Sequence, residues 1–119
     1  MKVENENGDI LSASDVMTMA SSSVTASNTE IIKIGNVLYL AGCITHNENN
    51  IQNGVAVATM KSGYRPKKNA FSNCTLRKDT DEQSASVVYV ETGGGIKIMC
   101  YPTTEKYRNI YFNMWYEIA

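Results

Sequence analysis

Short apolar runs, separated by polar or glycine-containing segments, extend along most of this 119-residue chain. Every second side chain over 110–118 and 96–101 is apolar, which predicts two strands, and 96–101 is expected to be half-buried. Segments 70–76 and 85–91 are also predicted to be strands. The pattern contains about seven such strands with turns between them and no long helix, which is typical of an antiparallel β-sandwich.

The clearest predicted hairpin is centred on Gly35-Asn36, which separates the apolar runs 31–34 and 37–44. Both faces of segment 37–44 are apolar, so we expect both to be covered. One face can enter the core of the domain. The other face needs a second sheet, the N-terminal segment or another chain over it.

A second informative stretch runs from residue 53 to residue 71. The apolar run 55–60 predicts a short strand buried on both faces, and Ser62-Gly63 predicts a turn after it. Pro66 holds Arg65 in an extended conformation, so no helix starts there. Residues 93–95, three glycines, predict a further turn.

The N-terminal residues 1–28 differ from the rest of the chain because Ser, Thr, Asn and acidic residues dominate them. Ser12 or Ser14 could cap a short helix that opens at Asp15. A mobile linker is the alternative interpretation. We therefore divide the chain into an N-terminal linking segment, 1–28, and one main domain, 29–119.

Composition and charge exclude several classes of function. The net charge is −1, and the isoelectric point of about 5.8 argues against a broad surface for nucleic acid or anionic membranes. No apolar run approaches the roughly 20 residues of a membrane span, so we expect no membrane insertion. The N-terminus lacks the apolar stretch of a secretion signal. We expect a protein made in a cytosol that stays there, or leaves by lysis or on a particle.

Cysteine chemistry is not indicated either. Cys43, Cys74 and Cys100 stand in apolar runs without CxxC spacing, so we expect buried thiols rather than a metal or redox site. A cysteine nucleophile is the alternative, and it would need the single histidine, His46, beside it.

Other catalytic motifs are incomplete. The acidic residues of segment 79–82 lack the spacing of a calcium loop. Glu91 and Glu117 stand on predicted strands, where they could face each other as a glycosidase pair. The triple glycine lacks the lysine and helix of a phosphate-binding loop. We therefore expect no cofactor, no metal and no enzymatic activity.

Four segments in this order resemble a known family: an apolar strand ending in Gly63-Tyr64-Arg65-Pro66, the hairpin 31–44, the glycine turn within 87–99 and the aromatic closing strand 110–118. Over roughly residues 29–118 the chain resembles the C-terminal head domains of bacteriophage tail-fibre and receptor-binding or baseplate proteins. The resemblance implies a small β-sandwich or jelly-roll head domain. It also implies that residues 1–28 form a neck between the head and a phage or prophage particle.

The resemblance further implies a homotrimer that binds a saccharide or protein on the host cell surface and contacts other tail or baseplate proteins. Such a protein is assembled in the bacterial cytoplasm and is part of the virion. A trimer axis would cover the second face of segment 37–44, and the interior strand of a monomeric sandwich is the alternative. A purely structural tail component without a ligand is the rival function, and a depolymerase ranks last.

A ligand site can be proposed if successive strands simply reverse direction. Loops 45–53, 77–84 and 103–109 then share one end of the domain. Their polar and aromatic side chains suit sugar hydroxyls and C–H faces, and we expect a pocket, within one chain or between two, lined by His46, Asn47, Tyr107 and Arg108. Ordinary solvated loop residues are the alternative. Trp115 is expected to be packed rather than exposed.

Overall fold

The computed structural model describes residues 2–5, 8–78, 82–99 and 107–119. Within these residues one short helix accompanies ten strands. The elements in chain order are β1 Lys2–Asn5, β2 Gly8–Leu11, α1 Ala13–Val16, β3 Met17–Met19, β4 Val24–Ile34, β5 Val37–His46, β6 Ala58–Met60, β7 Ala70–Arg77, β8 Gln83–Val90, β9 Gly95–Met99 and β10 Asn109–Glu117.

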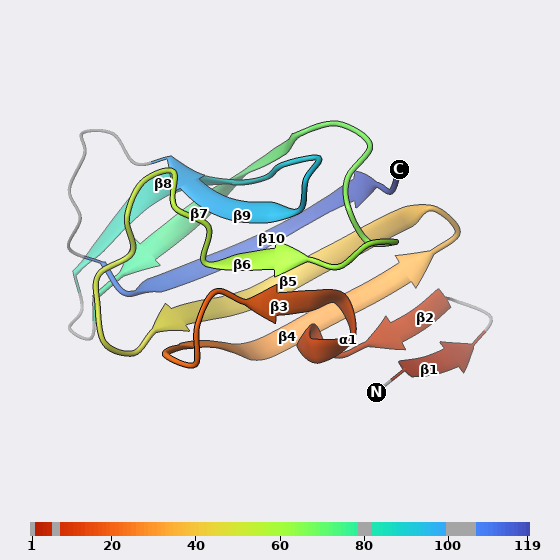
Figure 1. The fold of residues 1–119 in the computed structure, drawn as a ribbon, viewed down its shortest axis with the longest axis horizontal. Helices are drawn as coiled ribbons and strands as arrows, with labels where there is room; N and C mark the ends of the chain where they lie inside the picture. The colour runs from red at the N-terminus through yellow and green to blue at the C-terminus, as the bar shows by residue number, and fades with distance from the viewer. Residues whose placement is uncertain (1, 6–7, 79–81, 100–106) are drawn as a thin grey trace.

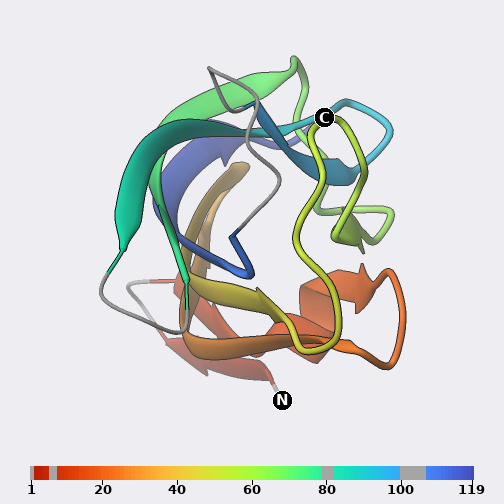
Figure 2. The ribbon, with the colours of Figure 1, turned by 90° about the vertical axis from the view of Figure 1, so that its left-hand side faces the viewer.

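All ten strands belong to one antiparallel sheet, in the order β1-β2-β4-β5-β10-β7-β8-β9-β6-β3. The strands run roughly along the long axis of a molecule that measures 41 × 25 × 22 Å (Figure 1). Viewed end-on, the sheet curls around the hydrophobic core, and α1 lies against β4 (Figure 2).

The all-β, antiparallel prediction is confirmed, whereas the predicted two-sheet sandwich or jelly roll of about seven strands is wrong. A single curled sheet turns the inner faces of its two halves toward each other, as the two layers of a sandwich do. Both arrangements give the same alternation of buried and exposed positions along each strand. The sequence pattern therefore could not distinguish them.

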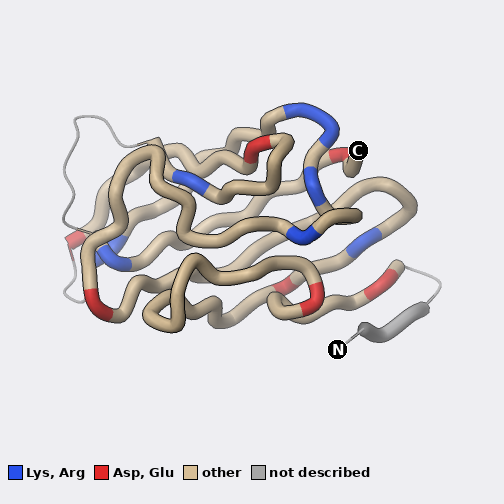
Figure 3. Tube along the Cα trace, viewed as in Figure 1, with Lys and Arg blue, Asp and Glu red and all other residues tan. Residues whose placement is uncertain are grey.

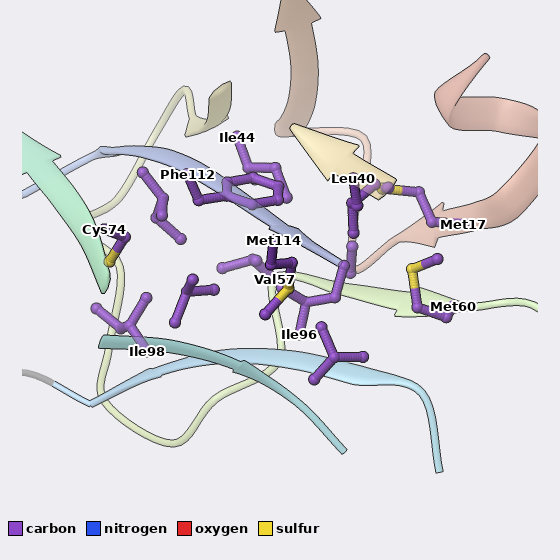
Figure 4. Close-up of a cluster of buried hydrophobic side chains, with 14 of the residues drawn as sticks. Met17, Leu40, Ile44, Val57, Met60, Cys74, Ile96, Ile98, Phe112 and Met114 are labelled. Carbon is purple, nitrogen blue, oxygen red and sulfur yellow. The ribbon is translucent and has the colours of Figure 1, made fainter. Parts of the chain in front are cut away.

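The inner face of the sheet encloses the hydrophobic core (Figure 4). Leu38 and Leu40 of β5 are 0% exposed within the single chain. In β10 every second residue from Ile110 to Tyr116 is buried, and Ile118 follows directly after the strand. Met17 of β3 and Met60 of β6 reach the same core, as does Val57 from the segment before β6. The chain itself therefore covers one face of the doubly apolar strand, and Tyr39 and Ala41 lie half-buried on the other.

Two further local predictions have different outcomes. The hairpin around Gly35-Asn36 is confirmed, although β4 starts at Val24 and contains an irregularity between Ser27 and Glu30. The strand predicted over 55–60 is shorter in the structure, where it is β6. This strand is not buried on both faces, because Thr59 is exposed. The predicted packing of Trp115 is also wrong, since its side chain is 72% exposed.

The predicted N-terminal helix is present as one turn. Ser12 occupies the N-cap position, and its backbone N–H donates to the Asp15 carboxylate at 2.8 Å. Val16 and Met17 then enter the core, and the Ala20 N–H donates to the Val57 carbonyl at 2.9 Å. Residues 8–28 thus contribute to the sheet, while their role as a neck to a larger particle remains a prediction.

The Gly63-Tyr64-Arg65-Pro66 turn holds the C-terminal strand in place. Pro66 forms an isolated bridge with Ile118, and the Arg65 carbonyl accepts from the Ala119 N–H at 3.0 Å. The Tyr116 hydroxyl donates to the Tyr64 carbonyl. This turn, the β4–β5 turn and the β8–β9 turn all lie at the same end of the sheet, because Asn36, Arg65 and the 93–95 glycines bond to neighbouring strands there.

Candidate functional site

A hollow of about 450 Å³ lies at the opposite end, where the chain leaves β5. We call it the His46 hollow. It is lined by Val24, His46, Asn49, Asn50, Ile51, Gln52, Val55, Ala56 and Val57. Its volume is within the range of about 300–1,000 Å³ that small-molecule sites usually have.

Three backbone hydrogen bonds fix the loop that forms the hollow. The Ile51 N–H donates to the Tyr107 carbonyl at 2.8 Å, the Gly54 N–H to the Ile98 carbonyl at 3.1 Å, and the Val57 N–H to the Ile96 carbonyl at 2.9 Å. The Ile51 side chain is buried in the core and anchors the loop from below. A loop held on both sides in this way presents its polar side chains from a defined backbone.

His46 stands at the rim of the hollow and organises the start of the loop. Its backbone N–H donates to the Arg108 carbonyl at 2.9 Å. Its Nδ1 accepts from the N–H groups of Asn49 at 3.1 Å and Glu48 at 3.3 Å. An accepting Nδ1 carries no proton, so the neutral ring has its proton on Nε2, and Nε2 is the ring's donor for other partners.

The structure brings the backbones of the predicted site residues together, but only His46 lines the hollow. Asn47 is directed to the residue before β4, where its Nδ2 donates to the Ser23 carbonyl at 2.9 Å. Tyr107 is buried in the core, and its carbonyl supports the loop. Arg108 is half-buried, and its backbone joins His46 to Arg77. Whether this group binds a ligand remains a prediction from the sequence.

Sequence reasoning missed the side chains of Asn49, Asn50 and Gln52, although it placed their loop, 45–53, at the site. With Val55 and Val57 they give a lining of amides, one imidazole and aliphatic groups. Among the described residues that line the hollow there is no Lys, Arg, Asp or Glu. Amides can both donate to and accept from hydroxyl or peptide groups, so the lining favours an uncharged polar ligand.

A second, more open hollow of about 740 Å³ lies across β5, β10 and β7. It is lined by Asn28, Gly42, Cys43, Asn73, Cys74, Thr75, Ala85, Tyr111, Phe112 and Asn113. The irregularity in β4 shapes its edge: Asn28 has a φ of 51°, and a Cβ on Gly42 would lie 3.1 Å from the Ser27 carbonyl oxygen. Glycine at residue 42 therefore allows β4 to approach β5 closely.

The two glutamates considered as a glycosidase pair each form an ion pair with a lysine. Glu91 pairs with Lys97 at 2.6 Å, and Glu117 pairs with Lys67 at 3.5 Å. The Glu91 hydrogen bond raises the pKa of Lys97 above its ordinary value. Cys43 and Cys74 are buried, as predicted.

Two of the acidic residues considered for a calcium loop, at positions 79 and 81, lie outside the described residues. The third cysteine, at position 100, lies outside them as well. In the described part of the chain, His, Cys, Asp and Glu do not gather in threes that could hold a metal ion. Over that same part, no helix has the length and apolarity that a membrane crossing requires.

Basic side chains are concentrated away from the His46 hollow. Figure 3 shows lysines and arginines in the loop between β6 and β7, near the C-terminus. Lys61 donates to the Ser14 carbonyl at 2.8 Å, and Arg65 donates from Nε to the Met60 carbonyl at 2.9 Å. These two cations help to hold the turn, whereas the described residues that line the His46 hollow include no lysine or arginine.

Comparison with known proteins identifies a similar fold. No protein-family model matches the sequence, and no curated protein matches it either. Among solved structures, the crystal structure of the head domain of lactococcal phage bIL170 matches with a TM-score of 0.62 and 20% sequence identity, over 83% of this chain and 92% of that chain. The chain has the fold of the bIL170 head domain.

The bIL170 head is one of the receptor-binding domains of lactococcal phages. The predicted likeness to a phage head domain is therefore confirmed for the fold. At 20% identity the bIL170 head does not assign roles to individual side chains, so the description of the hollows depends on this chain alone.

Proposed function

We propose that this protein is the host-attachment head domain of a phage or prophage tail protein. In this role it is non-catalytic, forms a homotrimer and belongs to the virion, where it contacts other tail or baseplate proteins. The observation that carries the proposal is the likeness of its fold, over 83% of the chain, to the head domain of a lactococcal phage. Several heads on one particle would raise weak individual affinities through effective concentration.

The His46 hollow is the proposed ligand site, with Asn47, Tyr107 and Arg108 supporting its loop. Its ligand is an uncharged saccharide or a polar segment of a surface protein. The amides of Asn49 and Gln52 are exposed at the hollow and can bond to hydroxyl or peptide groups. Val55 adds an exposed apolar surface for the C–H face of a sugar or for an aliphatic side chain.

The test is binding of the isolated, fluorescently labelled protein to a glycan array and to a panel of bacterial strains. The double variant Asn49→Ala/Gln52→Ala removes two exposed amides without touching the core, and we expect its affinity to fall at least about tenfold. Gln83→Ala removes an exposed amide on β8 that does not line the hollow, so binding by this control variant should be unchanged.

Unchanged binding by the folded double variant would move the ligand site elsewhere on the domain. Absence of binding to every strain and glycan would favour the rival function, a structural tail, baseplate or fibre component. Release of products from purified host polysaccharide would favour an enzyme.

A further inference from the structure

The ring of His46 holds the first turn of the loop between β5 and β6 (Figure 1). Its Nδ1 lies 3.1 Å from the Asn49 nitrogen and 3.3 Å from the Glu48 nitrogen, and it accepts from both N–H groups. Among the described residues, these two N–H groups have no second hydrogen-bond partner. The imidazole therefore takes the role that the side-chain oxygen of an asparagine or aspartate has in an Asx turn.

Fixed points on either side separate this turn from the rest of the loop. Before it, the His46 N–H donates to the Arg108 carbonyl at 2.9 Å. After it, Ile51 is buried, and its N–H donates to the Tyr107 carbonyl at 2.8 Å. Residues 48–50, whose side chains are exposed, span the distance between these points. Their backbone is the part of the hollow that depends on the ring of His46.

The turn depends on the protonation state of that ring. A neutral imidazole accepts at Nδ1 when its proton is on Nε2, whereas a doubly protonated imidazole donates at both nitrogens and accepts at neither. Histidine is the side chain that changes its charge between about pH 5 and 8. A second proton on His46 would direct an N–H group at the N–H groups of Glu48 and Asn49, and all three would then need water as their partner.

The described surroundings of His46 contain few other ionisable groups. Glu48 carries a carboxylate on the same exposed turn. From the segment before β10, Arg108 and the buried Tyr107 meet the loop through their carbonyl groups. The other described residues that line the hollow do not titrate. Guanidinium and phenol groups keep their charge between about pH 5 and 8. Glu48 is therefore the group to control for, because a carboxylate near an imidazole favours its charged form.

We propose that His46 is a positioning residue, which orders the loop of the hollow while its ring is neutral and releases residues 48–50 when it takes up a second proton. The proposal deepens the proposed function, on which it rests for the ligand, by making attachment through the His46 hollow sensitive to acid. Asn49 and Asn50 both line the hollow from within this turn, so their amides lose their fixed position when the turn is released.

The first experiment needs no ligand. His46 is the only histidine of the chain, so its ring signals are unambiguous in an NMR titration of the full chain from about pH 8 to about pH 5. At the alkaline end the ring nitrogens should show the proton on Nε2. As the ring takes up its second proton, the heteronuclear NOE of the Glu48 and Asn49 amides should fall, whereas that of the Ile51 amide should not change. A change of charge alone would shift the signals without loosening the backbone.

Three variants separate the acceptor from the charge. Asparagine Oδ1 and histidine Nδ1 are both attached to Cγ, so His46→Asn keeps an acceptor at this place and does not titrate. Its turn should stay ordered throughout the titration. His46→Ala removes the acceptor, and its turn should be loose at both ends of the titration. Glu48→Gln removes the nearby carboxylate and should retain the wild-type pH dependence. The wild-type titration decides if a variant does not fold.

The second experiment measures binding of the labelled protein to the bacterial strains and the glycan array at about pH 8 and about pH 5. Groups on the host surface titrate equally for both proteins, so His46→Asn serves as the reference. Relative to this reference, the wild-type affinity should fall at least about fivefold toward acid, the equivalent of about one net hydrogen bond.

The outcomes separate this inference from the proposed function. A proton on Nδ1 at the alkaline end, or a wild-type turn that stays ordered at the acid end, would overturn the inference. Equal pH dependence of binding in the wild type and in His46→Asn would overturn it as well. Absence of binding at both pH values would contradict the attachment function, and a turn that loosens in acid would then still support the role of His46.

Discussion

At the scale of single residues, the closing strand shows how much simple alternation can predict. Ile110, Phe112, Met114 and Tyr116 were expected on one face, and all four are buried. Trp115 lies on the opposite, outer face, as the same alternation requires. We nevertheless expected it to be packed, because tryptophan is usually highly buried. Its pattern position was the better guide, because alternation reports the face of the sheet and residue type reports only an average burial.

Tyr116 allows a test at this scale. Its ring is buried in the core, and its hydroxyl donates to the Tyr64 carbonyl of the turn before β7. Tyr116→Phe keeps the ring and removes the donor, so we expect the free energy of unfolding to fall by about 1–2 kcal/mol. Denaturant titration measures the change. Tyr111→Phe, on the exposed outer face, is the matched control, and an equal loss there would contradict the assigned hydrogen bond.

Tyr116 also predicts a pH dependence. Burial raises the pKa of its hydroxyl above the ordinary value of 10.0, because the charged form would lose its hydration. Above pH 10.0 the unfolded chain releases this proton and the folded chain retains it, so stability is intact below that pH and falls above it. Tyr116→Phe should lose less stability between neutral and alkaline pH than the wild type does. Identical pH profiles would contradict the burial effect.

At the scale of elements, strands with strong apolar patterns were predicted well and those with weak patterns were missed. β5, β7, β8 and β10 stand within a few residues of their predicted positions. β3 and the first half of β4 lie in Ser- and Thr-rich sequence, where neither alternation nor turn residues mark a strand. These segments are strands because β6 and β5 offer them hydrogen-bonding edges, and such tertiary pairing is not encoded in local propensity.

The β8–β9 turn gives a prediction with an internal control. Gly94 has a φ of +99°, and a Cβ there would lie 2.6 Å from the Met60 carbonyl oxygen. Gly94→Ala should therefore lower the free energy of unfolding by at least about 2 kcal/mol, from backbone strain and displacement of β6. A Cβ on Gly93 would meet no atom within 4 Å, so Gly93→Ala should change stability by less than about 0.5 kcal/mol. Thermal unfolding compares the two, and equal effects would contradict the described turn.

At the scale of the whole molecule, the order of strands in the sheet lay beyond the sequence. The last strand, β10, lies between β5 and β7, and β6 extends the sheet at the far side between β9 and β3. Alternation identifies the buried face of a strand without identifying its neighbours, so one curled sheet and two stacked sheets remained equivalent. The sequence predicted that the loops of the candidate site lie at one end of the domain. It did not predict which side chains line the site, because the burial of Tyr107 depends on the path of the loop after β5.

The position of the N-terminal segment leads to a prediction about the smallest folded unit. Leu11, Val16, Met17 and Val24 are buried in the common core. Burial of four such side chains contributes roughly 6–12 kcal/mol, which is comparable to the whole free energy of unfolding of a small domain, about 5–15 kcal/mol. A chain that begins at residue 29 should therefore lack a cooperative thermal transition.

The matched control is a chain that begins at residue 8. It loses β1, which pairs only with β2 at the outer edge of the sheet, and it keeps the four buried residues. We expect this shorter chain to unfold cooperatively near the midpoint of the full protein. If the chain beginning at residue 29 melts like the full protein, the core contacts of the N-terminal segment contribute little. Residues 1–28 would then be an appended neck, as the sequence resemblance implied.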